Sequence, residues 1–224
     1  MNDSKEHIIK VALKLFLQYN FKEVTMQDIM EKTGLSKGTL YYHFKSKEDL
    51  FIMAFSFYSS IKRNQYEEYS KDSFYKFYHD YANHIKESDH RFRQLVVDDN
   101  DNSDDFNINH FTLQFDILKV LPEFKGAIRI EQKNELDSWT MAIQRAKNNG
   151  EIYSSTNERL IAQMFLCLNE GVSAYSILGG NKIDLVNSLL IYWDWLYEQL
   201  KTPLIQDNTY NLNENKTNSL NYKK

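Results

Sequence analysis

The stretch Thr33–Lys47, TGLSKGTLYYHFKSK, decides the fold of the amino-terminal part of the chain. Gly34 supplies the permissive backbone that an abrupt helix end requires. Ser36 is a preferred residue type for capping the helix that follows, in which Leu40 and Phe44 lie four positions apart on one buried face. The pattern therefore predicts two short helices joined by a tight turn.

The residues on either side of this stretch predict three more helix boundaries. Thr25 can cap a short helix over residues 26–32, and Ser46 with Asp49 fits a capping box that opens the next helix. Upstream, residues 6–17 carry a first helix. The first 47 residues are therefore expected to hold three helices, the last two forming a helix-turn-helix.

The exposed faces of the helix after Ser36 carry groups that suit contact with DNA: Lys37, Thr39, Tyr41, Tyr42 and His43. A first turn with a lysine, a hydroxyl and the bare backbone of Gly38 can come close to a phosphate strand. It can still present side chains to base edges. Lys45 and Lys47, at the next junction, suit phosphate contacts.

The order of these segments resembles the amino-terminal domain of the TetR family of bacterial repressors, and especially its multidrug-binding branch. The resemblance is carried by VALKLF at residues 11–16 and FKEVTMQDIMEKTGLSKGTLYYHFKSKEDLF at residues 21–51. It implies that the family's operator-contacting positions are, in this chain, Thr25, Ser36, Lys37, Gly38, Thr39, Tyr41, Tyr42, His43 and Lys47.

Charge is distributed unevenly along the chain. Residues 1–47 contain 8 lysines and 5 acidic residues, which is a net charge of +3. Because the whole chain has a net charge of −4, the remaining residues have a net charge of −7. A basic reading head on an acidic body attracts phosphates locally and discourages indiscriminate binding to nucleic acid.

Composition favours a compact, mostly helical protein of 224 residues with only 2 prolines and 7 glycines. The single cysteine, Cys167, excludes an internal disulfide and is expected to be an inert core residue in the run AQMFLCL. No uncharged apolar run approaches the roughly 20 residues that span a bilayer, so a soluble, cytoplasmic protein is expected.

Beyond residue 47 the chain is expected to be all-α. Helices are predicted at residues 46–69, 72–86, 90–97 and 106–120, from Pro122 to Asn149-Gly150, and at 157–178 and 183–201. We expect a helix-turn-helix domain at 1–47, a larger helical effector-binding and dimerisation domain at 48–201, and a disordered tail at 202–224.

The last two predicted helices, 157–178 and 183–201, have wide apolar sides. The first carries Ile161, Met164, Phe165, Leu168, Val172 and Tyr175, and the second Val186, Leu189, Leu190, Trp193, Leu196 and Tyr197. In the TetR-like family the corresponding pair forms a four-helix interface with its twin, which implies a homodimer. The alternative is that both faces serve only the core of one chain.

The middle helices carry more tyrosine hydroxyls than a dry core would favour, since each buried one needs a partner. An aromatic-lined cavity for a small hydrophobic or aromatic effector is therefore predicted. Its candidate lining residues are Phe77, Tyr81, Phe111, Phe115, Trp139, Ile143, Glu170 and Tyr175. If Glu170 faces the cavity, a flat cation is favoured; the alternative is that it faces solvent or pairs with a lysine.

No metal site or cofactor is expected. The acidic segment Asp98–Asp105 lacks the central glycine and closing glutamate of an EF-hand loop, and is interpreted as a solvated loop. The histidines have no cysteine or carboxylate at firm metal-ligand spacing.

Three classes of function fit these observations unequally. The leading hypothesis is a regulator that binds a palindromic DNA operator as a homodimer and is released by a small-molecule effector. The second is a DNA-binding regulator controlled by a partner protein or by its own abundance. An enzyme is disfavoured, since the sequence offers no nucleophile with a positioned base and no glycine-rich phosphate loop.

Overall fold

The computed structural model describes residues 3–96, 106–179 and 184–201, and every regular element in those ranges is an α-helix. The amino-terminal helices are α1 (Asp3–Glu23), α2 (Met26–Thr33), α3 (Lys37–His43) and α4 (Lys47–Lys62). The later ones are α5 (Phe74–Val96), α6 (Phe106–Val120), α7 (Phe124–Asn148), α8 (Glu158–Leu178) and α9 (Leu185–Lys201). The predicted all-α fold, with a helix-turn-helix followed by a larger helical domain, is confirmed.

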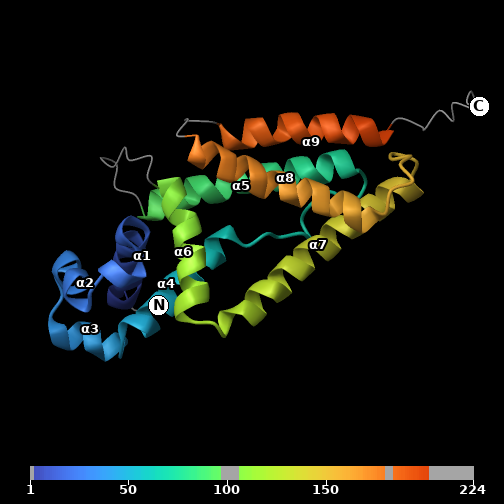
Figure 1. The fold of residues 1–224 in the computed structure, drawn as a ribbon. Coiled ribbons are helices and arrows are strands. Elements are labelled where there is room, and N and C mark those ends of the chain that lie inside the picture. Colours follow the sequence, from blue (N-terminus) through green and yellow to red (C-terminus); the bar gives the residue numbers. More distant parts are fainter. Residues whose placement is uncertain (1–2, 97–105, 180–183, 202–224) are drawn as a thin grey trace, which may run out of the picture.

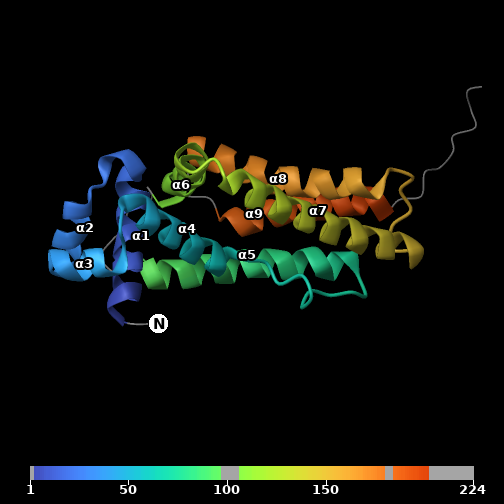
Figure 2. The ribbon, with the colours of Figure 1, turned by 90° about the horizontal axis from the view of Figure 1, so that it is seen from below.

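The helices separate into a head and a body (Figure 1). Helices α1, α2 and α3 form the head at one end of the molecule, and α5, α7, α8 and α9 run along the body. Helix α6 stands between the two, and α8 and α9 lie side by side, as Figure 2 also shows. The acidic segment 98–105 and the tail 202–224 lie outside the described residues.

The first hydrophobic core belongs to the head and extends beyond it. Buried side chains of α1 and α4, among them Phe16 and Phe51 with ring centroids 4.8 Å apart, pack with Phe92 of α5 and Ile117 of α6. Burial of apolar area is the main force that holds such elements together. The head is therefore packed directly against α6 and the end of α5, and α4 shares its core. The predicted boundary at residue 47/48 remains a prediction.

The second core fills the body and is dominated by aromatic rings. Trp139 and Trp193 are both fully buried, with ring centroids 5.3 Å apart, and Phe165 lies 5.6 Å from Trp139. The Trp193 indole donates a hydrogen bond of 3.0 Å to the Phe165 carbonyl, which satisfies its buried N–H.

Three predicted helices have other bounds in the structure. Helix α1 runs from Asp3 to Glu23 rather than over residues 6–17. Helix α4 ends at Lys62 rather than continuing to Tyr69, and the backbone of Arg63 is extended (φ −62°, ψ 125°). Helix α5 runs unbroken to Val96 through Glu87-Ser88-Asp89, where a gap was predicted. The buried hydroxyl of Ser88 donates to the Ile85 carbonyl of the same helix at 2.9 Å, so this polar run does not interrupt it.

Cys167 is not the core residue that the apolar run suggested, because it is exposed on α8. The run is apolar on two sides of the helix, and Phe165, not Cys167, faces the core. Within 3–96, 106–179 and 184–201, no helix combines the length and hydropathy needed to cross a membrane.

Candidate DNA-binding site

The turn between α2 and α3 is built from local caps. The Thr25 backbone N–H and hydroxyl both donate to the Asp28 carboxylate at 2.7 Å, while the Asp28 N–H donates back to the Thr25 hydroxyl at 3.2 Å. These hydrogen bonds, first that of the Thr25 side chain, lower the pKa of Asp28. At the other end of α2, Gly34 adopts φ +68°, and its N–H donates to the Met30 carbonyl at 3.0 Å. The predicted cap and turn are confirmed.

Helix α3 is anchored on its inner side and capped at its start. Leu40 is fully buried and Phe44 nearly so. The Ser36 hydroxyl accepts a hydrogen bond from the Thr39 N–H at 3.2 Å, and the two hydroxyls pair at 2.9 Å. The orientation of α3 is therefore fixed by the head itself, before any ligand is bound.

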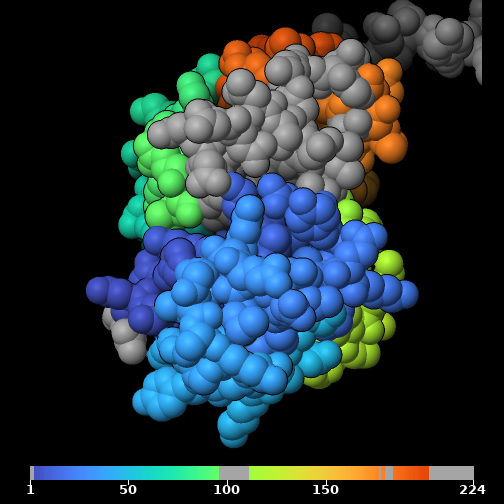
Figure 3. Space-filling model, turned by 90° about the vertical axis from the view of Figure 1, so that its left-hand side faces the viewer, coloured from blue at the N-terminus to red at the C-terminus, as the bar shows by residue number. Residues whose placement is uncertain are grey.

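The outward side of α3 presents the aromatic residues that the sequence singled out. Tyr42 is 83% exposed and Tyr41 44% exposed. The Lys37 ammonium lies 5.9 Å from the centre of the Tyr41 ring, and the His43 ring stands edge-on to Tyr42 with centroids 5.0 Å apart. Figure 3 looks onto this end of the molecule, where the lighter blue residues of α2 and α3 form the outer surface.

Gly38 lies in the first turn of α3, and the head does not require it for packing. A Cβ atom built on Gly38 would meet only the Ser36 hydroxyl, at 3.8 Å, which is ordinary contact. Gly34, in contrast, has the positive φ that favours glycine. A helix glycine with open space beside it suits a site where another molecule approaches the backbone closely.

Lys47 lies at the same end of the head, but its ammonium is already engaged. It donates hydrogen bonds to the carbonyls of Phe21 and Val24, both at 2.8 Å, and stands 4.2 Å from the centre of the Phe21 ring. The sequence predicted only a phosphate contact for Lys47. The structure gives it a second role, which is to hold the end of α1 against the start of α4.

The candidate effector residues are only partly brought together. Phe77, Tyr81, Trp139 and Ile143 are buried in the second core, where the Trp139 ring centroid lies 5.3 Å from that of Phe77 and 5.1 Å from that of Tyr81. Phe111 is half-buried on α6, whereas Phe115, Glu170 and Tyr175 are exposed. The four buried residues therefore form one cluster, and Phe111, Phe115 and Tyr175 are not part of that buried core.

Sequence reasoning missed Glu135, which lies one helical turn before Trp139 on α7. Its carboxylate accepts hydrogen bonds from the hydroxyls of Tyr66 at 2.8 Å and Tyr81 at 2.9 Å. Burial and the charge of Glu135 raise the pKa of both tyrosines. Glu135 lies four residues before Trp139, and this spacing was the available signal that it faces the same side of α7. Its partner Tyr66 is 69 residues away, so the hydrogen bond between Tyr66 and Glu135 could not be predicted.

Glu170 completes this acidic region from α8. Its side chain is exposed at the surface. Its pKa is nevertheless raised, first by partial desolvation of the carboxyl and second by the nearby charge of Glu135. Trp139 contributes a buried indole N–H that finds no acceptor among the described residues. Two carboxylates and an unused donor thus adjoin the aromatic cluster.

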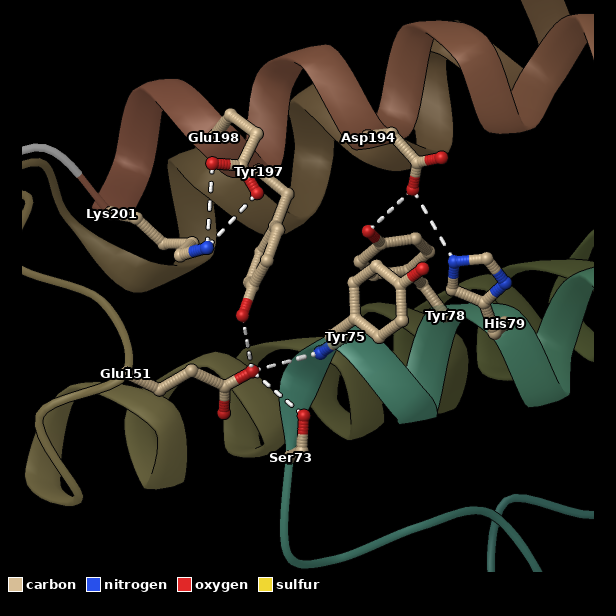
Figure 4. Close-up of polar contacts among 9 residues, drawn as sticks. All are labelled: Ser73, Tyr75, Tyr78, His79, Glu151, Asp194, Tyr197, Glu198 and Lys201. Carbon is tan, nitrogen blue, oxygen red and sulfur yellow. Dashed lines mark hydrogen bonds and ion pairs between the residues drawn. The ribbon is translucent and has the colours of Figure 1, made fainter.

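A second polar cluster, at the start of α5, is structural (Figure 4). The Glu151 carboxylate accepts hydrogen bonds from the Ser73 and Tyr197 hydroxyls, each at 2.8 Å, and from the Tyr75 N–H at 3.0 Å. Burial alone would raise the pKa of Glu151, but these hydrogen bonds outweigh it and lower the pKa. Asp194 similarly accepts from the Tyr78 hydroxyl at 2.7 Å, so both acids hold α5 in place.

Comparisons with known proteins agree with this arrangement. The family model of the bacterial regulatory proteins of the tetR family matches residues 8–54. The HTH-type transcriptional regulator YerO of Bacillus subtilis is 40% identical over 72 residues, which cover 32% of this chain and 25% of YerO. IcaR of Staphylococcus aureus, a negative transcriptional regulator of the biofilm operon icaADBC, is 24% identical over 173 residues, or 69% of this chain and 91% of IcaR.

Among solved structures, the fold is similar to that of NalD of Pseudomonas aeruginosa, the secondary repressor of the MexAB-OprM multidrug efflux pump. The TM-score is 0.60 at 14% sequence identity, covering 88% of this chain and 95% of that one. The match to YerO spans only about a quarter of that protein's length.

The fold and the capped turn define a helix-turn-helix protein with a larger helical body. The tetR family model matches residues 8–54, and the fold shared with NalD extends over 88% of the chain, so the amino-terminal region is similar to the DNA-binding domain of the TetR family.

Proposed function

We propose that this protein is a transcriptional regulator, and specifically a repressor, that binds a palindromic DNA operator as a homodimer and is released by a small-molecule effector. The observation that carries the proposal is the rigid, capped α3, which presents Tyr41, Tyr42 and Lys37 to solvent beside the bare backbone of Gly38. Such a helix can enter the major groove and meet phosphates at its start.

A test of this proposal begins with selection from a random duplex pool. The full chain is expected to enrich a palindrome, and Tyr42→Ala is expected to weaken binding to it by roughly 1–3 kcal/mol and to reorder the affinities of base-substituted operators. Tyr19→Ala, which removes an exposed tyrosine of α1, is the matched control. Failure of the wild-type chain to enrich any sequence would overturn the proposal.

The dimer is supported by an exposed apolar stripe on α8 and α9. It consists of Leu160, Met164, Cys167, Tyr175 and Leu178 on α8 and Ile191, Tyr192 and Trp195 on α9. Most side chains that the sequence suggested for this interface instead lie wholly or partly in the second core, whereas Met164 and Tyr175 belong to the stripe. Exposed apolar residues on two adjacent helices fit a self-complementary contact with a second copy.

For the effector, we propose a flat aromatic cation that binds near Glu135 and Glu170. Glu135 is partly buried, Glu170 lies near it on the surface, and the rings of Tyr81 and Trp139 lie beside Glu135. The unpartnered N–H of Trp139 adds a hydrogen-bond donor for the ligand.

This effector class predicts a charge-dependent difference between two ligands of similar shape. At neutral pH, 9-aminoacridine is a cation and acridine is uncharged, so the protein alone should bind the first more tightly. Glu170→Gln should weaken 9-aminoacridine by about tenfold and leave acridine unchanged, because only the cation interacts with the lost charge. Calorimetry measures both affinities, with Glu131→Gln on the exposed side of α7 as the control.

Two outcomes would count against the effector. Equal affinities for the two acridines would contradict the cation. If neither ligand bound while operator DNA was still bound, the alternative would be favoured, in which a partner protein or abundance controls the regulator.

A further inference from the structure

The end of α1 contains a sharp change of backbone direction. Asn20 adopts φ +60° and ψ 169°, a backbone conformation that is strained for any residue other than glycine. Its side-chain carbonyl accepts hydrogen bonds from the N–H groups of Lys22 at 3.0 Å and Glu23 at 3.3 Å. The helical hydrogen-bond pattern is thus broken just before Phe21.

The backbone N–H of Phe21 finds its partner on α6, the helix between the head and the body. It donates to a carboxylate oxygen of Asp116 on α6, 95 residues away in sequence, at 3.0 Å. Phe21 itself is buried in the first core. A backbone donor buried at a break in a helix needs such a partner, and the charged acceptor makes the bond a strong one.

The carbonyl of the same residue binds the start of α4. Lys47 donates to it and to the Val24 carbonyl, both at 2.8 Å. Val24 immediately precedes Thr25, the cap of α2, and the charge of Lys47 also contributes to the lowered pKa of Asp28 in that cap. Phe21 therefore connects α6 on one side with α4 and the entrance to α2 on the other.

Two neighbours of Asp116 on α6 are apolar and buried. Leu113 and Ile117 of α6 are buried in the first core against α1. Apolar packing is non-directional, so it resists separation of the head and α6 more than a small rotation between them. A hydrogen bond between the two has a defined length and angle, and it fixes the rotation.

We propose that Asp116 is a positioning residue for DNA binding. By holding Phe21, and through it Lys47, it sets the orientation of the helix-turn-helix on the body. In a symmetric dimer, that orientation determines the distance between the two copies of α3 and hence the half-site spacing that is recognised. The inference rests on the proposed function for its DNA consequence, and on the proposed homodimer for the head-to-head distance that reports its conformational one.

The DNA test uses the selected palindrome and versions with one base pair inserted or deleted between the half-sites. Wild-type protein should favour the selected spacing by at least about tenfold over both others. Asp116→Ala should bind the selected spacing about tenfold more weakly and discriminate little between the three, because the head can rotate. Asp116→Asn keeps an acceptor oxygen and should retain the preference, as should Lys119→Ala, an exposed control on the same helix.

A second measurement needs no DNA. Spin labels at position 42, introduced as Tyr42→Cys in a Cys167→Ser background, report the distance between the two heads of a dimer. The distribution should be narrow in the otherwise unchanged protein and clearly broader with Asp116→Ala. Thermal unfolding of each variant confirms that the comparison concerns folded protein.

The two failures are distinguishable. An unchanged distance distribution, or a uniform loss of affinity that keeps the spacing preference, overturns the role of Asp116. Absence of DNA binding by the wild-type protein overturns the proposed function, and the distance measurement then still decides whether Asp116 orients the head.

Discussion

Replacing Gly38 with alanine is expected to weaken operator binding by roughly tenfold to a hundredfold while leaving the protein as stable as before or slightly more so. Inside the protein the added methyl group meets only the Ser36 hydroxyl, at an ordinary 3.8 Å. Alanine also favours the helix over glycine by up to about 1 kcal/mol. The loss of binding would then arise from the surface that faces DNA and not from the fold.

Two other glycines of the chain serve as controls. Gly126 lies in α7 with nothing within 4 Å of an added Cβ, so Gly126→Ala should give a comparable stability change with no effect on DNA. Gly34 has φ +68°, and Gly34→Ala should therefore destabilise the head. Fluorescence anisotropy with labelled operator and chemical denaturation measure the two quantities separately.

These expected results distinguish Gly38, which is proposed to lie against DNA, from Gly34, which forms a structural turn in the same short motif. If Gly38→Ala bound the operator as tightly as the wild-type protein, the backbone at the start of α3 would not approach DNA. Helix α3 could still lie in the major groove, but the proposed position of its first turn relative to the DNA backbone would be wrong.

The parts of the fold that could be predicted are those determined by neighbours in sequence. Thr25, Gly34, Ser36 and Ser46 act within four residues of themselves, and the structure confirms each as a cap or turn. The outward residues of α3, which are proposed to face DNA, could be predicted to be exposed for the same reason, because a short capped helix anchored by a buried residue leaves few faces undecided.

What could not be predicted depends on contacts between distant segments. The bond between Asp116 and Phe21 joins residues 95 apart, and nothing near either residue in the sequence indicates it. The early end of α4 has the same origin. The segment after Lys62 is held by tertiary bonds, such as that from the Ser70 N–H to Asp80 at 2.8 Å, and not by a local stop signal.

The two wide helices near the end of the chain illustrate a different limit. Helices α8 and α9 are apolar on more than one side, and a pattern with period 3.6 does not tell which side faces the same chain. Phe165 and Trp193 face inward, while Trp195, two positions later, is 64% exposed. Only the packed structure separates the residues of the core from those that are left for a partner.

Those outward residues give the second large expected effect. If the proposed dimer forms, replacing Ile191 and Trp195 together with glutamate should convert it to a single chain and lower operator affinity by at least about a hundredfold, because one head reads only half of a palindrome. Both side chains are exposed, 68% and 64%, so the fold of one chain should tolerate the change. Placing four like charges together on a two-fold interface should prevent association.

The matched control is Ile130→Glu on α7, since Ile130 is 61% exposed and lies outside the stripe. Light scattering at micromolar concentration should give twice the chain mass of 26.7 kDa for the wild type and this control, and the single mass for the double variant. A single-chain mass for the wild type would exclude the homodimer. A dimeric double variant would place the interface on another surface, and the head separation that Asp116 is proposed to control would have to be reconsidered from that surface.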